Sequence, residues 1–201
     1  MKRKTRNPAK AKQEIIEKSA PIFNQYGYAG TRLEMLIKAT GYQKGGIYNH
    51  FGSKMELAQA AFQHNFSLLK DTYFQAMTVA DTPKNQLIAF LEGFKKYIVQ
   101  PPIKGGCPIL NMAIEVDDTD ETNRLLVKAA LDEWKEMIEA VLAKGLKTGD
   151  FKADINVQQE ALFIIASIEG SIMLGQLKRS AKLMLGVADS LRKYIELRVF
   201  S

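Results

Sequence analysis

One stretch constrains the fold more than any other part of the chain: TRLEMLIKATGYQKGGIYNHFGSKMEL, residues 31–57. Thr31 belongs to the residue types that cap helix N-termini. Three apolar side chains then follow with the spacing of one helical face: Leu33, Leu36 and Ile37. Gly41 tolerates the left-handed backbone that ends a helix. A second apolar face begins after this glycine and predicts another short helix: Tyr42, Ile47, Tyr48 and Phe51.

The second of these helices has the composition of a DNA-reading surface. Two short helices joined by a tight turn form a helix-turn-helix, whose second helix can enter a major groove. Away from its apolar face lie polar side chains and glycines: Gln43, Lys44, Gly45, Gly46, Asn49 and His50. Lysine supplies charge to phosphates, amide side chains pair with base edges, and glycines let backbone amides approach the sugar-phosphate chain. The predicted DNA-contacting set is Thr31, Arg32, Gln43, Lys44, Gly45, Gly46, Tyr48, Asn49, His50 and Lys54.

The spacing of these residues resembles the N-terminal signature of the TetR family of transcriptional regulators. The matching positions are Gly27, Tyr28, Thr31, Gly41, Lys44, Gly45, Ile47, Tyr48, Phe51, Ser53, Lys54 and Leu57. The close match covers residues 10–60. Four positions depart from the family pattern. Gln43 stands where Ser or Thr often caps the recognition helix, and Gly46 replaces a frequent Ser or Thr. Ile37 and Thr40 replace small residues usually found in the second helix.

The resemblance implies an all-α fold of about nine helices. A three-helix DNA-binding head, residues 1–52, would precede a helical body, residues 53–201, that dimerises and binds an effector. Such a protein is a sequence-specific transcriptional regulator, more often a repressor, which a small molecule releases from a palindromic operator. A dimer would place two recognition helices about 34 Å apart, in successive major grooves.

The distribution of charge agrees with this division. Residues 1–60 hold eleven Lys or Arg and four acids, a net charge of +7, whereas the rest of the chain carries −1. This is the pattern expected when one end of a protein meets a polyanion and the other does not. For Lys2 to Lys12 alone, a solvated basic tail is an equally good explanation.

Local signals predict where several helices begin and end. Residues 1–10 form a flexible basic arm, and Pro21 should kink or break the first helix. Gly27 should lie just past the end of that helix. Ser53, with Glu56 in a capping box, starts a long helix that links head to body. The lysine after it, Lys54, is unfavourable at a helix N-terminus, which favours a phosphate partner. An acidic loop over residues 115–121 would precede another long helix, with Asp118 as its cap.

The body offers candidate residues for an effector pocket, although the same pattern is typical of a plain core. A small apolar or amphipathic effector would contact large side chains that recur at helical spacing, together with one cysteine. These candidates are Phe62, Phe66, Phe90, Phe94, Cys107, Met112, Trp134 and Phe163. The sequence does not identify the effector.

The last two helices predict a homodimer. Residues 157–177 are apolar on nearly every side from Ala161 to Leu174, so something must cover both faces. The resemblance implies a four-helix interface with a second copy, and an internal core helix is the alternative. The predicted interface residues are Ala166, Gly170, Met173, Val187, Leu191 and Tyr194.

Cys107 is the one cysteine of the chain. At a helix N-terminus its thiolate would be stabilised, and Gly105 and Gly106 would leave it accessible. A repressor that senses oxidants or electrophiles through Cys107 is therefore an alternative. A small buried cysteine packed beside Pro108 is the favoured explanation.

Other classes of protein find less support. A thiol enzyme would need Cys107 and His64, and an architectural DNA binder would lack sequence preference. We expect no enzyme activity, metal or cofactor, since the acidic loop fits no calcium-binding pattern and no catalytic set is present. A lone cysteine and the lack of an apolar run long enough to span a bilayer favour a cytoplasmic protein without membrane contact.

Overall fold

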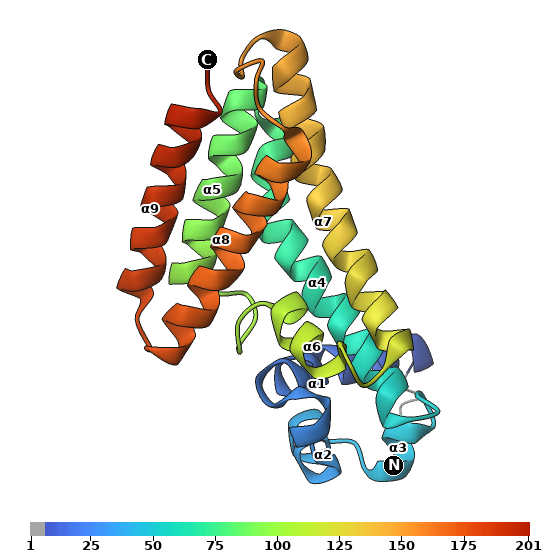
Figure 1. The fold of residues 1–201 in the computed structure, drawn as a ribbon. Helices are drawn as coiled ribbons and strands as arrows, with labels where there is room; N and C mark the ends of the chain where they lie inside the picture. Colours follow the sequence, from blue (N-terminus) through green and yellow to red (C-terminus); the bar gives the residue numbers. More distant parts are fainter. Residues whose placement is uncertain (1–6) are drawn as a thin grey trace. The chain divides into compact units, whose positions relative to one another are not determined.

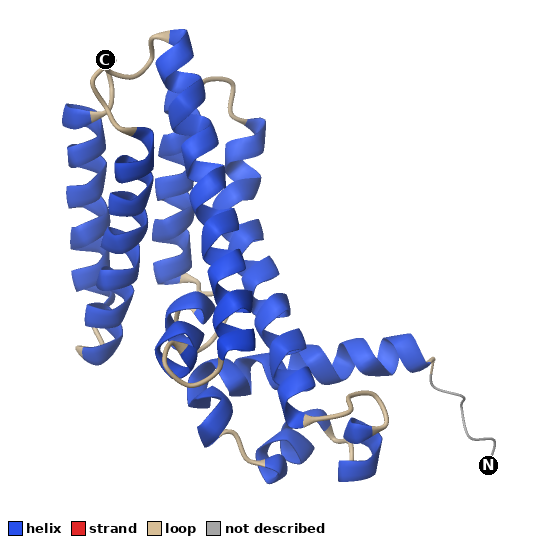
Figure 2. Ribbon diagram, turned by 45° about the vertical axis from the view of Figure 1, so that its right-hand side comes forward, coloured by secondary structure: helices blue, strands red, loops and turns tan. Residues whose placement is uncertain are grey.

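The computed structural model describes residues 7–201, the side chain of residue 76 excepted. Within this range the chain forms nine α-helices and no extended strand (Figures 1 and 2). The helices are α1 Pro8–Gly30, α2 Leu33–Thr40, α3 Lys44–Tyr48, α4 Lys54–Val79, α5 Pro83–Val99, α6 Pro108–Val116, α7 Glu121–Thr148, α8 Val157–Leu177 and α9 Ala181–Arg198. The predicted all-α class and helix number are therefore confirmed. Most of the predicted basic arm, residues 1–6, lies outside the described residues.

The contacts between residues divide the chain into two compact units. The first contains the residues up to Ser67 together with Ile103–Arg124, and the second contains Leu68–Pro102 together with Leu125–Ser201. The long helices α4 and α7 each begin in the first unit and end in the second. The first unit thus includes α6 as well as the helix-turn-helix, so it is larger than the predicted head of residues 1–52.

The first unit has a small apolar core that fixes the helix-turn-helix. Its buried members come from α1, α2, α3 and the start of α4: Ile15, Ala20, Phe23, Leu36, Ile47, Phe51, Leu57, Ala58 and Ala61. Ile47 is fully buried, so its side chain anchors the five-residue α3 to this core. Tertiary packing must supply this anchor, since a single helical turn is unstable alone.

The first helix differs from its prediction at both ends. It begins at Pro8, where the Asn7 side chain accepts a 3.0 Å hydrogen bond from the Ala9 amide. Pro is tolerated at the first helical position, since that N–H has no intrahelical partner. The predicted break at Pro21 is wrong, because the non-helical backbone lies at Gly27, with φ 68° and ψ 177°. This conformation is essentially restricted to glycine.

Two predicted caps also need correction, and one is confirmed. Arg32, without a side-chain bond, precedes α2 in place of Thr31. Asp120 rather than Asp118 caps α7, because its carboxylate accepts a 3.0 Å hydrogen bond from the Asn123 amide. The Ser53 cap is confirmed by a 3.0 Å bond from the Glu56 amide.

The predicted acidic loop is shorter than expected. Helix α6 runs to Val116, so Glu115 is helical and only the residues after it connect α6 to α7. The apolar positions of α6, among them Ile109 and the buried Val116, continue the helical period through this acidic residue.

The second unit is built around an aromatic core on α4, α5 and α7. The Tyr73 ring stacks on the Trp134 ring at 5.7 Å between centroids, and Phe90, Phe94 and Tyr97 lie within 6.3 Å of it. Helix α9 packs against α5 and α8 within the same unit.

Helix α8 is long and apolar enough to cross a membrane by length and composition, with a mean hydropathy of 1.4 over its best window. The expectation that no such run exists is therefore wrong. Core helices of soluble proteins meet the same criterion, so the finding is weak evidence for a membrane. One face of α8 is buried in the second unit: Ala161, Ile164, Ile165, Ile168, Ser171, Ile172 and Gly175.

Candidate functional site

The helix-turn-helix is tied to α1 by polar contacts around its turn. Gly41 ends α2 with φ 75°, the left-handed conformation that glycine adopts freely. The Tyr42 hydroxyl donates a 3.2 Å hydrogen bond to the Glu14 carboxylate, and Lys18 pairs with the same carboxylate at 2.7 Å. A Cβ at Gly46 would lie 3.3 Å from the Tyr42 ring, so a side chain at this position would press against the tyrosine that bonds Glu14.

Most of the predicted DNA-contacting residues lie at the surface of α3 and its flanks. Arg32, Gln43, Lys44, Gly45 and Asn49 are exposed. Gly46, Tyr48 and His50 are half-buried. The N-cap residue Gln43 makes no side-chain capping bond, as its departure from the family pattern suggests. Its amide therefore faces solvent, where a base edge or phosphate oxygen could bind it.

Two predicted DNA-contacting residues are engaged within the protein. Thr31 is 1% exposed, and its hydroxyl donates a 2.6 Å hydrogen bond to the Gly27 carbonyl. The Lys54 ammonium donates to the Tyr28 carbonyl and lies 4.3 Å from the centre of the Tyr28 ring. Burial lowers the pKa of Lys54, and the nearby Glu115 carboxylate opposes that shift. The structure thus gives Lys54 a local partner, where the sequence favoured a phosphate.

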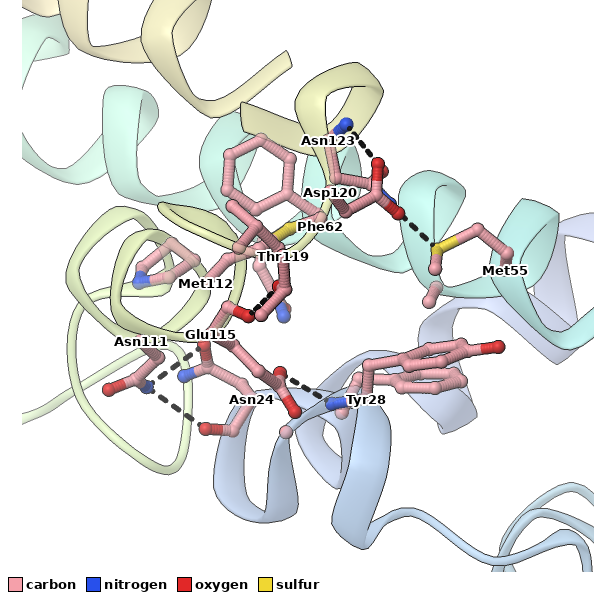
Figure 3. Close-up of a pocket in the computed structure, with 16 residues that line it drawn as sticks. Asn24, Tyr28, Met55, Phe62, Asn111, Met112, Glu115, Thr119, Asp120 and Asn123 are labelled. Atoms are coloured by element: carbon pink, nitrogen blue, oxygen red, sulfur yellow. Dashed lines mark hydrogen bonds between the residues drawn. The ribbon is translucent and has the colours of Figure 1, made fainter. Parts of the chain in front are cut away.

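A cavity of about 260 Å³ lies within the first unit (Figure 3). Its lining comes from the end of α1, the first turns of α4, one side of α6, and the start of α7 with the segment before it. The lining residues are Phe23, Asn24, Gly27, Tyr28, Met55, Ala58, Phe62, Asn65, Pro108, Asn111, Met112, Glu115, Val116, Thr119, Asp120 and Asn123. The cavity therefore adjoins the segment from which α2 begins.

Glu115 connects the cavity wall to the backbone that precedes α2. One carboxylate oxygen accepts a 2.7 Å hydrogen bond from the backbone amide of Tyr28 (Figure 3). The other accepts a 2.8 Å hydrogen bond from the backbone amide of Ala29. A Cβ at Gly27 would lie 2.7 Å from the same carboxylate, so glycine allows this close approach. Hydrogen bonds from backbone N–H groups to a carboxylate belong to the strong, charge-assisted class.

The structure does not gather the eight predicted effector-pocket residues around one cavity. Phe62 and Met112 line the cavity of the first unit, and Phe66 stacks on Phe62 at 6.4 Å. By contrast, Phe90, Phe94 and Trp134 are fully buried in the aromatic core of the second unit. Phe163 is 45% exposed and lies 4.5 Å from the Tyr194 ring.

Cys107 differs from its predicted accessibility. It precedes α6 but is 0% exposed, so the two glycines before it do not open it to solvent. A fully buried cysteine behaves as a small apolar side chain. The structure therefore gives no support to a redox sensor or a thiol enzyme at this position, and the packing explanation holds.

The predicted dimer residues divide between the surface and the core of the second unit. Ala166 and Met173 are exposed on α8, and a Cβ at Gly170 would meet no atom within 4 Å. Val187 and Tyr194 on α9 are half-buried. Leu191 is 3% exposed, which corrects its assignment to an interface. It packs inside the unit with the other buried residues of α9, Ala188 and Ile195.

Sequence reasoning missed most of the cavity lining. The hydrogen bonds that shape the lining join positions more than eighty residues apart in the chain: Asn24 to Gly106, Asn111 to Asn24, and Tyr28 to Glu115. The one local signal was an acid at Glu115 on an otherwise apolar α6 face.

Comparisons with known proteins agree over the whole chain. Residues 15–61 match the family model for bacterial regulatory proteins of the tetR family, and residues 83–191 match the tetracyclin repressor-like C-terminal domain. A TetR transcriptional regulator from Chloroflexus aurantiacus J-10-FL is 36% identical, with a TM-score of 0.91 over 98% of this chain and 99% of that one.

Two further relatives support the same assignment. A TetR-family regulator from Cytophaga hutchinsonii is 30% identical, with a TM-score of 0.87 over 99% of this chain and 100% of that one. The HTH-type transcriptional repressor DhaR from Mycobacterium sp. (strain GP1) is 26% identical over 169 residues, 84% of each chain. With a matching helix-turn-helix and a matching body, this chain belongs to the TetR family of DNA-binding transcriptional regulators.

Proposed function

We propose that this regulator is a cytoplasmic homodimeric repressor that a small molecule releases from a palindromic operator. The observation that carries the proposal is the exposed apolar face of α8. Its exposed large side chains are Leu162, Phe163, Met173, Leu174 and Leu177. Contiguous exposed apolar surface of this kind marks an interaction site, and a second copy presents the same surface.

A dimer also meets the energetic demands of finding one operator. A good base contact contributes roughly 1–3 kcal/mol of discrimination, and the five-residue α3 offers few of them. Two copies double the contacts and read a two-fold site, which raises specificity over random DNA. The relative DhaR is a transcriptional repressor, which favours repression over activation for this chain.

The test is operator binding by the full chain across a salt series. The DNA upstream of its own gene is compared with random duplex of equal length, and stoichiometry is measured alongside. We expect a site-specific advantage that survives at physiological salt, with two protein chains per site. Equal affinity for both duplexes, with a steep loss as salt rises, would favour phosphate binding without sequence preference. Selection from random DNA would then establish whether any operator exists.

A further inference from the structure

The cavity of the first unit combines an apolar body with acidic walls. Three aromatic rings face it, from Phe23, Tyr28 and Phe62, and Met55 and Met112 add flexible apolar surface. Of its sixteen lining residues, the two charged ones, Glu115 and Asp120, are both acids. A ligand without charge would leave that negative potential uncompensated.

Three of the four asparagine side chains that line the cavity already donate both of their hydrogens within the protein. The Asn24 amide nitrogen donates to the carbonyls of Lys104 and Gly106, and the Asn111 nitrogen donates to those of Asn24 and Gly105.

The same holds beside α7. The Asn123 nitrogen donates to the Asp120 carboxylate and to the Met55 sulfur, and the Thr119 hydroxyl donates to the Glu115 carbonyl. An amide nitrogen has two hydrogens, so these groups have none left for a ligand. The Asn65 nitrogen donates one hydrogen bond, to the Ala20 carbonyl, and keeps its second hydrogen. The other capacity that remains is that of acceptors, led by the two carboxylates.

Lys54 interacts with Glu115 and offsets part of its charge, but it does not line the cavity. Lys54 is held outside the lining by the Tyr28 carbonyl and ring. Hydrogen bonds from the Asn123 amide and side chain hold the pKa of Asp120 below its ordinary value, so Asp120 remains ionised at neutral pH.

We propose that this cavity binds a small amphipathic organic cation, with its apolar part among the aromatic rings and its ammonium group toward Glu115 and Asp120. Aromatic faces and carboxylates together are the chemistry that recognises ammonium ligands. The volume of about 260 Å³ lies just below the ~300–1,000 Å³ typical of small-molecule sites, which favours a compact ligand.

The site also explains how ligand binding could change the DNA-binding surface. This part of the inference rests on the effector response proposed above. A cation at Glu115 competes with the backbone amides of Tyr28 and Ala29 for the same carboxylate. These amides lie at the end of α1, a few residues before α2 begins at Leu33. A ligand that prefers one arrangement of this segment therefore changes operator affinity by linkage.

Calorimetry on the full chain tests the cavity directly. The probes are benzyltrimethylammonium, the neutral benzyl alcohol and the anionic phenylacetate. We expect the cation to bind roughly tenfold more tightly than the alcohol, and the anion not to bind. Equal affinity for cation and alcohol, or no cation binding at millimolar concentration, would overturn the proposal.

Three variants locate the binding. Met112→Trp fills the cavity and should abolish binding, while Asp120→Asn keeps a capping residue for α7 and should remove most of the preference for the cation. The matched control Glu121→Gln removes an acid that does not line the cavity and should bind as the wild type does. Unchanged cation binding by a folded Met112→Trp would place the site elsewhere.

Operator release is measured separately with the same probes. Cation binding without release would retain the cavity assignment and contradict the proposed effector response. If the cation also releases the folded Met112→Trp variant from the operator, the cavity assignment is contradicted and the effector response is retained.

Discussion

The Glu115 carboxylate on α6 accepts a 2.7 Å hydrogen bond from the backbone N–H of Tyr28, at the end of α1. A second bond, from the Ala29 amide, makes the carboxylate a cap for the two donors exposed after the break at Gly27. The segment that leads into the helix-turn-helix is therefore held by a side chain from another part of the sequence.

Removing this carboxylate should weaken the first unit. Glu115→Ala leaves the Tyr28 and Ala29 amides without their acceptor, and hydrogen bonds to charged groups contribute roughly 1.5–3 kcal/mol each at most. We expect a loss of about 2 kcal/mol in the free energy of unfolding, since one of the two amides is solvent-exposed. Urea denaturation measures this loss.

Two other variants control for the loss of charge. Glu115→Gln keeps one acceptor oxygen and should lose about half as much stability. Glu121→Ala removes an exposed acid that pairs with Arg124 and should change stability far less than Glu115→Ala does. If Glu115→Ala proved as stable as Glu121→Ala, the capping role would be refuted.

The backbone at Gly27 should be more sensitive to substitution than that at its neighbour Gly30. Gly27→Ala forces a side chain into a φ of 68° and brings its Cβ to 2.7 Å from Glu115, which should cost roughly 1–3 kcal/mol. At Gly30 a Cβ meets the Tyr26 side chain at an ordinary 3.6 Å. Thermal melts of the two alanine variants give the comparison, and equal melting temperatures would contradict it.

The helix-turn-helix could be predicted because its signals are local. Gly41 ends α2 and Ile47 anchors α3 within a few residues of each other, so spacing alone predicts both. Gly27 is also a local signal, since a glycine after the apolar face of the first helix predicts its end there, whereas the break expected at Pro21 does not occur. The contact between Gly27 and the Glu115 carboxylate could not be predicted, because the two positions are 88 residues apart.

The cavity could not be predicted because helical spacing does not distinguish a core from a ligand site. Phe62 and Trp134 both recur at apolar helix positions, yet one lines the cavity and the other stacks on Tyr73. The polar residues that shape the cavity, such as Asn24, contact the chain through its tertiary fold. No local pattern brings these positions together.

Lys44 is the exposed cation at the start of α3, and Lys44→Ala should weaken operator binding without unfolding the protein. A lost phosphate contact lowers affinity about equally for all sequences and reduces the salt slope by roughly one. Fluorescence anisotropy at several salt concentrations measures both quantities. Lys147→Ala, an exposed lysine at the end of α7, is the control, and an unchanged salt slope in Lys44→Ala would exclude a phosphate contact.

The exposed face of α8 gives a prediction about assembly. Leu174→Asp places a charge on that face, and burying an unpaired charge in an interface is strongly unfavourable. We expect monomers in sedimentation velocity and a loss of operator affinity. Leu125→Asp changes an equally apolar exposed residue on α7 and should leave the dimer intact. Dimers in Leu174→Asp would mean that this leucine lies outside the interface.

An ion pair between α5 and α9 should make stability depend on pH. The Lys95 ammonium lies 2.8 Å from the Asp189 carboxylate, and its hydrogen bond holds the pKa of Asp189 below the ordinary value. A carboxyl with a depressed folded pKa stabilises the protein above its unfolded pKa of about 3.9. That contribution is lost as the pH falls through the lower folded pKa.

Wild type should therefore be slightly more stable than Asp189→Asn at pH 7, by a small margin because the Asp189 carboxylate is exposed to solvent. The difference should shrink as the pH falls below about 4, where the wild-type carboxyl becomes neutral like the amide. Urea denaturation between pH 2 and 7 follows it, with Asp154→Asn in the loop before α8 as the control. If the stability difference between wild type and Asp189→Asn instead grew toward low pH, protonation of Asp189 would remove no favourable interaction. That result would show that Lys95 does not stabilise the carboxylate.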